Sequence, residues 1–339
     1  MWGMTYRRYE GSPAPDRIRR LTFVPFLPDG RCAAVPDPAG GPVLPSGDVR
    51  PGEHWLLDTS LRVPLATAGF RRQRVHVFAA DRDHVYAWLD GDRYTGRRQH
   101  ARVELVTGEP AELAERLAAA GRPDQAQAVR DAERSFSGQS DQDYYTDNVR
   151  LLEPAYLRGD TVQEGSGFGG DPARWRARRG MIVDGIDRGG SFLDLGCANG
   201  LLLESVRQWA AERGYAIEPY GVDLAPGLVE LARSRLPHWA DRIEVGNAVD
   251  YRPAGGQRFT FVHAMLDTVP ARQRAELVRH ALAELVAPGG RLLVSHYQGD
   301  GGTDRTAPEH LTALGFPVAG SSHARDNPRT ATTAWINAP

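Results

Sequence analysis

One segment in the second half of the chain has the residue types of a ligand-binding turn. Residues 192–200 read Phe-Leu-Asp-Leu-Gly-Cys-Ala-Asn-Gly, an apolar stretch that runs into glycines and then into a helical pattern. Glycine lets a backbone pass close to a ligand and adopt torsion angles that a Cβ atom disfavours. The first N–H groups of a helix have no partner within the helix, so they suit a polar or anionic ligand. The segment therefore predicts a small-molecule site between a strand and a helix.

The glycine spacing distinguishes between nucleotide cofactors. A dinucleotide-binding turn has the pattern G-x-G-x-x-G. The same frame here reads Gly196, Ala198 and Leu201, so two of the three glycines are absent. Asp223 ends the next predicted strand, where an acid can accept hydrogen bonds from ribose hydroxyls. These features disfavour NAD and favour another ribose-containing cofactor.

Residues 194–200 resemble the D-x-G-x-G-x-G motif of class I S-adenosylmethionine-dependent methyltransferases, with Ala198 at the central glycine. The resemblance continues through Asp223, the turn at 246–248 and the Pro-Gly-Gly segment at 288–290. It implies S-adenosyl-L-methionine as the cofactor, with glycines beside its methionine part, Asp223 on its ribose and residues 247–248 at its adenine. The expected cofactor-binding residues are Asp194, Gly196, Cys197, Ala198, Gly200, Asp223, Leu224, Asn247, Ala248 and His263.

The acceptor side of the reaction depends on side chains after the fourth and fifth predicted strands. Methyl transfer from a sulfonium is an in-line displacement, so the enzyme must orient the acceptor and, for a hydroxyl, remove its proton. His263 and His296 are general-base candidates because an unperturbed imidazole titrates near pH ~6.5. Each could instead be a strand-end side chain bonded to backbone. Asp267 could orient a histidine or cap the helix expected after Pro270.

Aromatic and basic residues before the first strand, and side chains at the sheet edge, complete the candidate site. In the family that the sequence resembles, N-terminal helices close over the cofactor and shape the acceptor pocket. The corresponding lid or substrate residues are Tyr144, Tyr145, Phe168, Trp175, Arg178, Met265 and Tyr297. The four aromatic lid candidates that precede the first strand, Tyr144, Tyr145, Phe168 and Trp175, could equally pack a seam between domains. Either Arg178 or Arg179 could meet the cofactor carboxylate.

Alternating strand and helix patterns must position these residues. We expect strands at 191–196, 219–223, 242–246, 258–263 and 291–297, and helices at 173–186, 201–213, 226–236 and 272–285. A last helix at 307–314 should precede strands near 316–319 and 332–336. This order predicts an α/β, Rossmann-like seven-stranded methyltransferase domain over residues 171–339, with a parallel sheet covered on both faces.

The N-terminal part reads as a smaller α+β domain over residues 1–136. Strands are expected at 21–26, 33–35, 74–80 and 84–89, and helices at 53–68, 110–120 and 123–136. Residues 47–70 resemble a Nudix box, but the positions of its paired metal-binding glutamates hold Ala66 and Thr67. Because Mg²⁺ needs carboxylate ligands, the resemblance implies a degenerate Nudix-like domain that serves binding, dimerisation or a lid. Residual pyrophosphohydrolase activity is the alternative for this half. Residues 137–170 should be linker and lid.

The composition excludes several classes of function. The net charge of −2 over 339 residues argues against a strongly cationic nucleic-acid binder. All 41 Lys and Arg residues are arginines, so Schiff-base lysine chemistry and a lysine-containing phosphate loop are excluded. The two cysteines cannot build a disulfide framework or a zinc site. No side-chain cluster has metal-ligand spacing, so we expect metal-free catalysis.

These features together predict an S-adenosylmethionine-dependent methyltransferase of small molecules, acting on oxygen or nitrogen, in specialised metabolism. We expect a small-molecule acceptor, no membrane or nucleic-acid partner, and a cytoplasmic location, because no apolar run approaches the ~20 residues of a membrane span. A homodimer is compatible with the N-terminal domain. Two alternatives stay open: a nucleotide or RNA methyltransferase, and a protein that binds S-adenosylmethionine without turnover.

Overall fold

The computed structural model describes residues 17–27, 29–49, 68–70, 76–81, 83–89, 97–98, 101–297 and 305–339. The chain forms two compact units, residues 1–147 and 148–339, and each is described by itself below. The boundary falls within residues 137–170, which the sequence predicted to be linker and lid. That segment is mostly helical, because α3 (Pro123–Gly138) reaches into it and α4 (Asp141–Leu157) crosses the boundary. A 3₁₀ turn, η3 (Glu164–Ser166), follows.

The C-terminal unit contains one seven-stranded sheet within the described residues, in the order β12-β11-β10-β13-β14-β16-β15. The strands are β10 (Gly190–Leu195), β11 (Ile217–Asp223), β12 (Ile243–Val245), β13 (Phe259–Met265), β14 (Val286–Tyr297), β15 (Gly320–His323) and β16 (Ala331–Asn337). β10 to β14 pair in parallel, whereas β16 runs antiparallel to β14 and β15. The strand order reverses at β10, so the carboxyl ends of β10, β11 and β13 meet at one edge where such sheets bind ligands.

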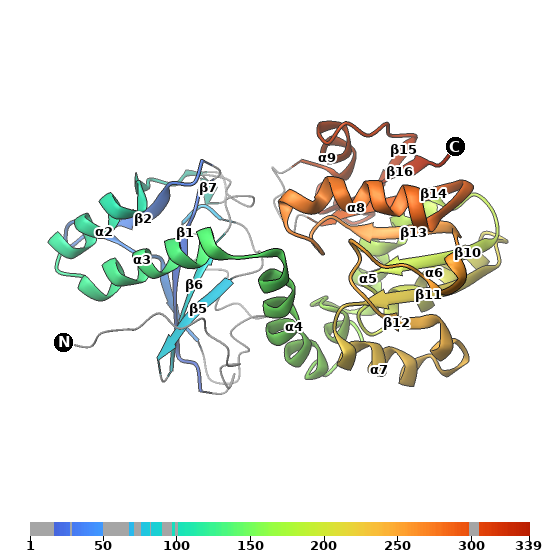
Figure 1. Cartoon of the computed structure of the whole chain (residues 1–339), viewed down its shortest axis with the longest axis horizontal. Coiled ribbons are helices and arrows are strands. Elements are labelled where there is room, and N and C mark those ends of the chain that lie inside the picture. Colours follow the sequence, from blue (N-terminus) through green and yellow to red (C-terminus); the bar gives the residue numbers. More distant parts are fainter. Residues whose placement is uncertain are drawn as a thin grey trace. The chain divides into compact units, whose positions relative to one another are not determined.

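Helices connect the strands and have sequence signals at their beginnings. They are α5 (Pro172–Arg179), α6 (Leu201–Ala211), α7 (Pro226–Arg235), α8 (Arg274–His280) and α9 (Ala307–Ala313) (Figure 1). The Asp171 carboxylate accepts a hydrogen bond from the Arg174 N–H at 2.8 Å and caps α5. Thr306 and Glu309 form a capping box at the start of α9. Shorter 3₁₀ turns lie at η4 (Gly180–Gly185), η5 (Pro237–Arg242), η6 (Ala254–Gly256) and η7 (Ala271–Gln273), and a π-helical turn (Ala281–Leu285) extends α8.

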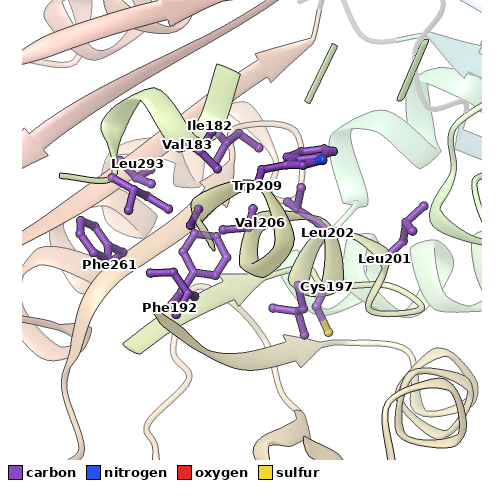
Figure 2. Packing of buried hydrophobic residues seen from close by; sticks show 14 of the residues in the cluster. Ile182, Val183, Phe192, Cys197, Leu201, Leu202, Val206, Trp209, Phe261 and Leu293 are labelled. Atoms are coloured by element: carbon purple, nitrogen blue, oxygen red, sulfur yellow. The ribbon is translucent and has the colours of Figure 1, made fainter. Parts of the chain in front are cut away.

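The core of this unit packs helical residues against one face of the sheet. Phe192, Phe261 and Leu293 come from three neighbouring strands and are fully buried. Ile182 of η4 and Val206 of α6 belong to the same apolar cluster (Figure 2). Burial of apolar surface is the main favourable contribution to folding. The cluster therefore fixes the three strands that carry the candidate site.

The N-terminal unit is a mixed α/β structure. Its described strands are β1 (Arg20–Pro25), β2 (Cys32–Pro36), β3 (Pro42–Val43), β4 (Ser46–Asp48), β5 (His76–Asp81), β6 (His84–Leu89), β7 (Arg97–Arg98), β8 (Ala101–Arg102) and β9 (Val106–Gly108). They form sheets in the orders β4-β1-β6-β5, β3-β2-β9 and β7-β8. Helices α2 (Pro110–Ala119) and α3 contribute Leu113, Leu117 and Val129 to a core with Val24 and Phe26. The Nudix-like identity of this unit stays a prediction, since residues 50–67 lie outside the described residues.

The periodic segments match most of the expected elements, with three main differences in the C-terminal unit. The strand expected at 291–297 begins earlier, as β14 at Val286. The strand expected at 316–319 is instead β15 at Gly320–His323, where it pairs with β16. The helix expected at 173–186 ends as α5 at Arg179 and continues as the 3₁₀ turn η4. Gly185 explains the tight packing there, because a Cβ on it would lie 2.5 Å from Leu293 Cδ2.

None of the helices in the described part of the chain is both long enough and apolar enough to cross a membrane. The cytoplasmic location stays a prediction.

Core packing in the C-terminal unit predicts a position-dependent cost of shortening leucine. Leu203 of α6 is fully buried, whereas Leu157 at the end of α4 is 46% exposed. We expect Leu203→Ala to lower the free energy of unfolding by about 2–5 kcal/mol, because it leaves a cavity in the core. The same change at Leu157 should cost about 0.5 kcal/mol or less. Urea unfolding followed by near-ultraviolet circular dichroism measures both, and equal losses would contradict the packing described.

Candidate functional site

The turn between β10 and α6 holds a left-handed backbone at three alternate positions. Gly196, Ala198 and Gly200 have φ of 90°, 47° and 77°. Ala198 is the one non-glycine residue with positive φ in the described chain, a conformation that costs an L-residue roughly 1–2 kcal/mol. Strain of this kind persists where the surrounding structure enforces it, often at a ligand site. The three positions are those of the glycine motif found in the sequence.

The Asp223 carboxylate, at the end of β11, holds this turn in place. Its Oδ2 accepts a hydrogen bond from the Ala198 N–H at 2.8 Å, and its Oδ1 accepts one from the Ala225 N–H at 2.9 Å. A carboxylate oxygen can accept more than one hydrogen bond. Asp223 can therefore support the turn and also receive ribose hydroxyls. Leu224 follows it and is half-buried.

Asn199 supports the turn from the other side. Its amide Nδ2 donates to the Val162 carbonyl at 2.8 Å, and its Oδ1 accepts from the Leu201 N–H at 3.2 Å. Arg235 of α7 donates to the Asn199 carbonyl at 2.6 Å. The side chain is 1% exposed. The sequence did not single out Asn199, because its partners Val162 and Arg235 are 37 and 36 residues away along the chain.

The remaining expected cofactor positions divide into two kinds. Asn247 lies after β12 and is half-buried; its Oδ1 accepts a hydrogen bond from the Val249 N–H at 3.2 Å, and Ala248 is buried beside it. Cys197 has a different place, because its side chain lies in the apolar core (Figure 2). A Cβ on Gly221 would be 2.8 Å from its Sγ. Burial raises the pKa of the Cys197 thiol well above its usual value, so only its backbone is suited to the ligand.

A row of hydrogen-bonded polar side chains crosses the sheet beneath this turn. His263 Nδ1 lies 2.7 Å from Asp194 Oδ1, and His263 Nε2 lies 2.9 Å from Ser295 Oγ. Ser295 Oγ is in turn 2.7 Å from Thr333 Oγ1. The exposed fractions are 2% for Asp194 and zero for His263, Ser295 and Thr333. We call Asp194, His263 and Ser295 the buried polar row.

The buried polar row changes the expected role of His263. A general base that acts directly must reach the proton it abstracts. His263 is fully enclosed, and both of its ring nitrogens face protein groups. The sequence suggested that His263 contacts the acceptor or the cofactor. The structure does not place it there, because the side chain is enclosed. Any part that it takes in proton transfer must pass through Ser295 or Asp194.

The second histidine, His296, lies on β14, on the face of the sheet opposite to Ser295. Successive side chains of a strand alternate between the faces of a sheet, so His296 faces away from Ser295 and Tyr297. It is 1% exposed, and its ring meets that of His310 of α9 edge-on at 4.6 Å. The structure therefore does not bring the two candidate bases together.

The edge of the sheet beyond Ser295 carries a cation over an aromatic ring. The guanidinium carbon of Arg179 is 3.4 Å from the ring centre of Tyr297. This distance lies well within the ~6 Å over which a cation and an aromatic ring attract each other. Burial lowers the pKa of Arg179, and the nearby Tyr297 and Asp267 oppose that shift. Asp267 thus faces Arg179 and Tyr297. It does not cap the following turn, which begins after Pro270 without a side-chain cap.

The other lid candidates lie in several places. Trp175 and Phe168 belong to the core of the C-terminal unit, and the Trp175 indole N–H donates to Ser205 Oγ at 2.9 Å. Arg178 pairs with Asp326 at 2.8 Å, which leaves Arg179 as the arginine for a ligand carboxylate. Met265 is half-buried at the end of β13.

Tyr144 and Tyr145 lie in the N-terminal unit, where their rings meet edge-on at 5.4 Å. Tyr144 also packs against His76 of β5, with 5.8 Å between ring centres. Both residues are buried. Their role as a lid stays a prediction.

Residues 170–324 match a family model described as a methyltransferase domain. Similar solved structures include 1,6-didemethyltoxoflavin-N1-methyltransferase of Burkholderia thailandensis, with 17% identity over 59% of this chain and 91% of that chain and a TM-score of 0.43. A S-adenosylmethionine-dependent methyltransferase of Aquifex aeolicus is 14% identical over 50% of this chain and 94% of that one, with a TM-score of 0.36. A search of the curated proteins found no match.

Residues 170–324 of the C-terminal unit thus match a methyltransferase domain, and the cofactor is S-adenosylmethionine, as the sequence predicted. The residues present fit this group. The left-handed turn brings backbone close to the ligand position, Asp223 offers carboxylate oxygens at the end of β11, and Arg179 supplies a cation over the Tyr297 ring. No group of three or more His, Cys, Asp or Glu side chains in those residues could hold a metal ion. Metal-free catalysis stays a prediction.

The backbone angles of the turn predict a loss of cofactor affinity when Gly200 becomes alanine and little change when Ala198 becomes glycine. Gly200→Ala places a Cβ at φ 77° and 2.7 Å from Leu236 Cδ1, so we expect the affinity for S-adenosylmethionine to fall about tenfold, equivalent to ~1.4 kcal/mol. Ala198→Gly relieves a left-handed alanine and should leave affinity within about threefold. Isothermal titration calorimetry measures both. Tight binding by Gly200→Ala together with weak binding by Ala198→Gly would contradict this geometry.

Proposed function

We propose that this protein transfers the methyl group of S-adenosylmethionine to a small molecule. The observation that carries the proposal is the strained turn at 196–200, held by Asp223, within a domain that matches the methyltransferase model. In this proposal the turn binds the methionine part, Asp223 the ribose, and residues 247–248 the adenine. Arg179 binds the cofactor carboxylate in this proposal, because its guanidinium lies over the Tyr297 ring at the same sheet edge.

The acceptor lies beyond the carboxyl ends of β13 and β14 in this proposal. Met265, Asp267 and Tyr297 are among the half-buried residues there, and in this proposal they contact an acceptor or orient it. A small acceptor agrees with the net charge of −2, which does not favour a nucleic-acid partner. Arginines such as Arg178, Arg213 and Arg235 are also engaged in ion pairs within the protein. The names of two similar structures refer to small-molecule substrates. They are Burkholderia thailandensis 1,6-didemethyltoxoflavin-N1-methyltransferase and geranyl diphosphate methyltransferase, the latter with a TM-score of 0.36. We do not extend their substrates to this chain.

The N-terminal unit is proposed to bind a ligand or a second copy of the chain rather than to catalyse. The Nudix-like pattern places Ala66 and Thr67 where metal-binding glutamates are needed, and neither supplies a carboxylate. Incubation with nucleoside diphosphate derivatives and Mg²⁺ should therefore release no products above background. Rapid cleavage would overturn this part of the proposal.

Label transfer from methyl-labelled S-adenosylmethionine tests the proposed function. We expect the full chain to produce S-adenosylhomocysteine and a labelled small product with at least one member of a panel of phenols, alcohols and amines. Asp223→Asn weakens ribose binding and should lower the rate at subsaturating cofactor at least tenfold, since a lost charged hydrogen bond is worth roughly 1.5–3 kcal/mol. Val245→Ala, at an exposed position of the neighbouring strand β12, is the control.

The same experiment distinguishes the alternatives. Label that appears in added RNA, with an affinity that falls steeply with salt, would replace the small acceptor by a nucleic acid. Calorimetric binding of S-adenosylmethionine without S-adenosylhomocysteine from any acceptor would show a binding protein that has no turnover. Either result would contradict the proposed function.

A further inference from the structure

A cavity with a volume of about 410 Å³ lies at the end of α6 that is remote from the strained turn. Its lining comes from α5, η4, the residues that follow α6, and the loop after β15. Because α6 begins at the turn and has 11 residues, roughly 16 Å of helix separates the cavity from the turn. Small-molecule sites have volumes of ~300–1,000 Å³. The cavity is therefore large enough for a ligand and is distinct from the cofactor site.

Three arginines line this cavity: Arg176 of α5, Arg213 after α6 and Arg325 after β15. We call them the arginine cluster. Asp184 holds two of them together, because its Oδ1 accepts from Arg213 Nη2 at 2.5 Å and its Oδ2 accepts from Arg325 Nη2 at 2.6 Å. Arg213 also donates to the Val183 carbonyl at 2.9 Å. These two guanidinium groups are thus fixed before a ligand arrives, which reduces the entropy that binding would cost.

The arginine cluster keeps hydrogen-bond donors for a ligand. A guanidinium carries several N–H donors, and Arg325 uses Nη2 on Asp184, whereas its Nε and Nη1 make no hydrogen bond with the described residues. Arg176 is paired with Glu212, but these side chains are 52% and 44% exposed. Exposed ion pairs contribute little to stability, so a ligand anion can replace Glu212 on Arg176. The lining residues and Asp184 together carry one net positive charge.

The rest of the cavity lining is largely apolar. Val183 and Trp209 belong to the core cluster that also contains Ile182 (Figure 2). The guanidinium carbon of Arg176 lies 5.7 Å from the ring centre of Trp209, within the ~6 Å over which a cation and an aromatic ring attract each other. A ligand in this cavity would therefore meet apolar side chains and cations together.

We propose that this cavity is a second ligand site, which binds a small molecule that joins a flat apolar ring to a phosphate group. Phosphate offers several acceptor oxygens, and the planar fork of arginine matches it with parallel hydrogen bonds. The arginine cluster binds the phosphate, and Val183 and Trp209 contact the ring. The site is separate from methyl transfer, so this inference does not depend on the proposed function.

Binding of phenyl phosphate to the full chain tests the second site. In saturation-transfer difference NMR we expect saturable binding with a Kd of about 1 mM or lower. Inorganic phosphate lacks the ring and phenol lacks the charge, so both should bind more weakly. Saturating S-adenosylhomocysteine should leave the affinity for phenyl phosphate within about twofold, because the two sites are remote. Competition between these two ligands, or phenol that binds as tightly as phenyl phosphate, would overturn the proposal.

Two variants should change the affinity for phenyl phosphate in opposite directions. Arg325→Gln removes charged donors and should lower the affinity about tenfold or more. The hydrogen bond from Arg176 holds the pKa of Glu212 below its usual value, so this carboxylate is charged at neutral pH and competes with the ligand. Glu212→Gln should therefore raise the affinity about threefold, a gain that a folding defect would not produce.

Arg252→Gln is the matched control, because Arg252 forms an exposed ion pair with Glu284 outside the cavity. It removes the same charge as Arg325→Gln and should leave the affinity within about twofold. Equal losses in these two variants would show a general effect of charge and overturn the second site. Unchanged affinity in both Arg325→Gln and Glu212→Gln would also overturn it.

Discussion

Two backbone N–H groups that donate to one carboxylate organise the candidate site of the C-terminal unit. Asp223 joins the end of β11 to the N–H groups of Ala198 and Ala225. Ala198 lies in the turn that begins α6, and Ala225 immediately precedes α7, so the acid holds two helix beginnings at one sheet edge. Hydrogen bonds to a charged acceptor are stronger than neutral ones. They can therefore sustain the left-handed backbone at Ala198, which an alanine in isolation would avoid.

The strained turn directly follows β10, and one member of the buried polar row, Asp194, lies on that strand. Asp194 precedes the turn by two residues and belongs to the row, so the position of the ligand turn and the orientation of His263 are mechanically coupled. A paired, buried charge is tolerated when its hydrogen bonds are satisfied, but it adds little net stability.

The sequence predicted the cofactor turn and the order of elements because these depend on local patterns. Glycine spacing, the acid at Asp223, and alternating strand and helix periods are all readable within short windows. The start of β15 was misplaced, since short polar strands such as Gly-Ser-Ser-His carry little apolar signal and are defined by pairing with β16. The helical content of 141–157 was also missed, because its apolar positions are irregular and Pro154 interrupts the pattern.

The acceptor side could not be predicted in the same way. His263 and His296 look equivalent in sequence, yet strand pleating places them on opposite faces, and only His263 meets Asp194 and Ser295. These partners are 69 and 32 residues away along the chain. Similarly, Arg178 and Arg179 are neighbours in sequence, but the helical turn points them in different directions. Arg178 forms an ion pair with Asp326, whereas Arg179 lies over the ring of Tyr297. Such choices depend on tertiary contacts.

A crystal structure of the full chain with S-adenosylhomocysteine tests the central claim most directly. The account predicts density for the ligand along the turn at 196–200, with its ribose hydroxyls on the Asp223 carboxylate and its sulfur facing the edge that carries Tyr297. Density at another place, or a bound ligand whose ribose does not contact Asp223, would contradict it.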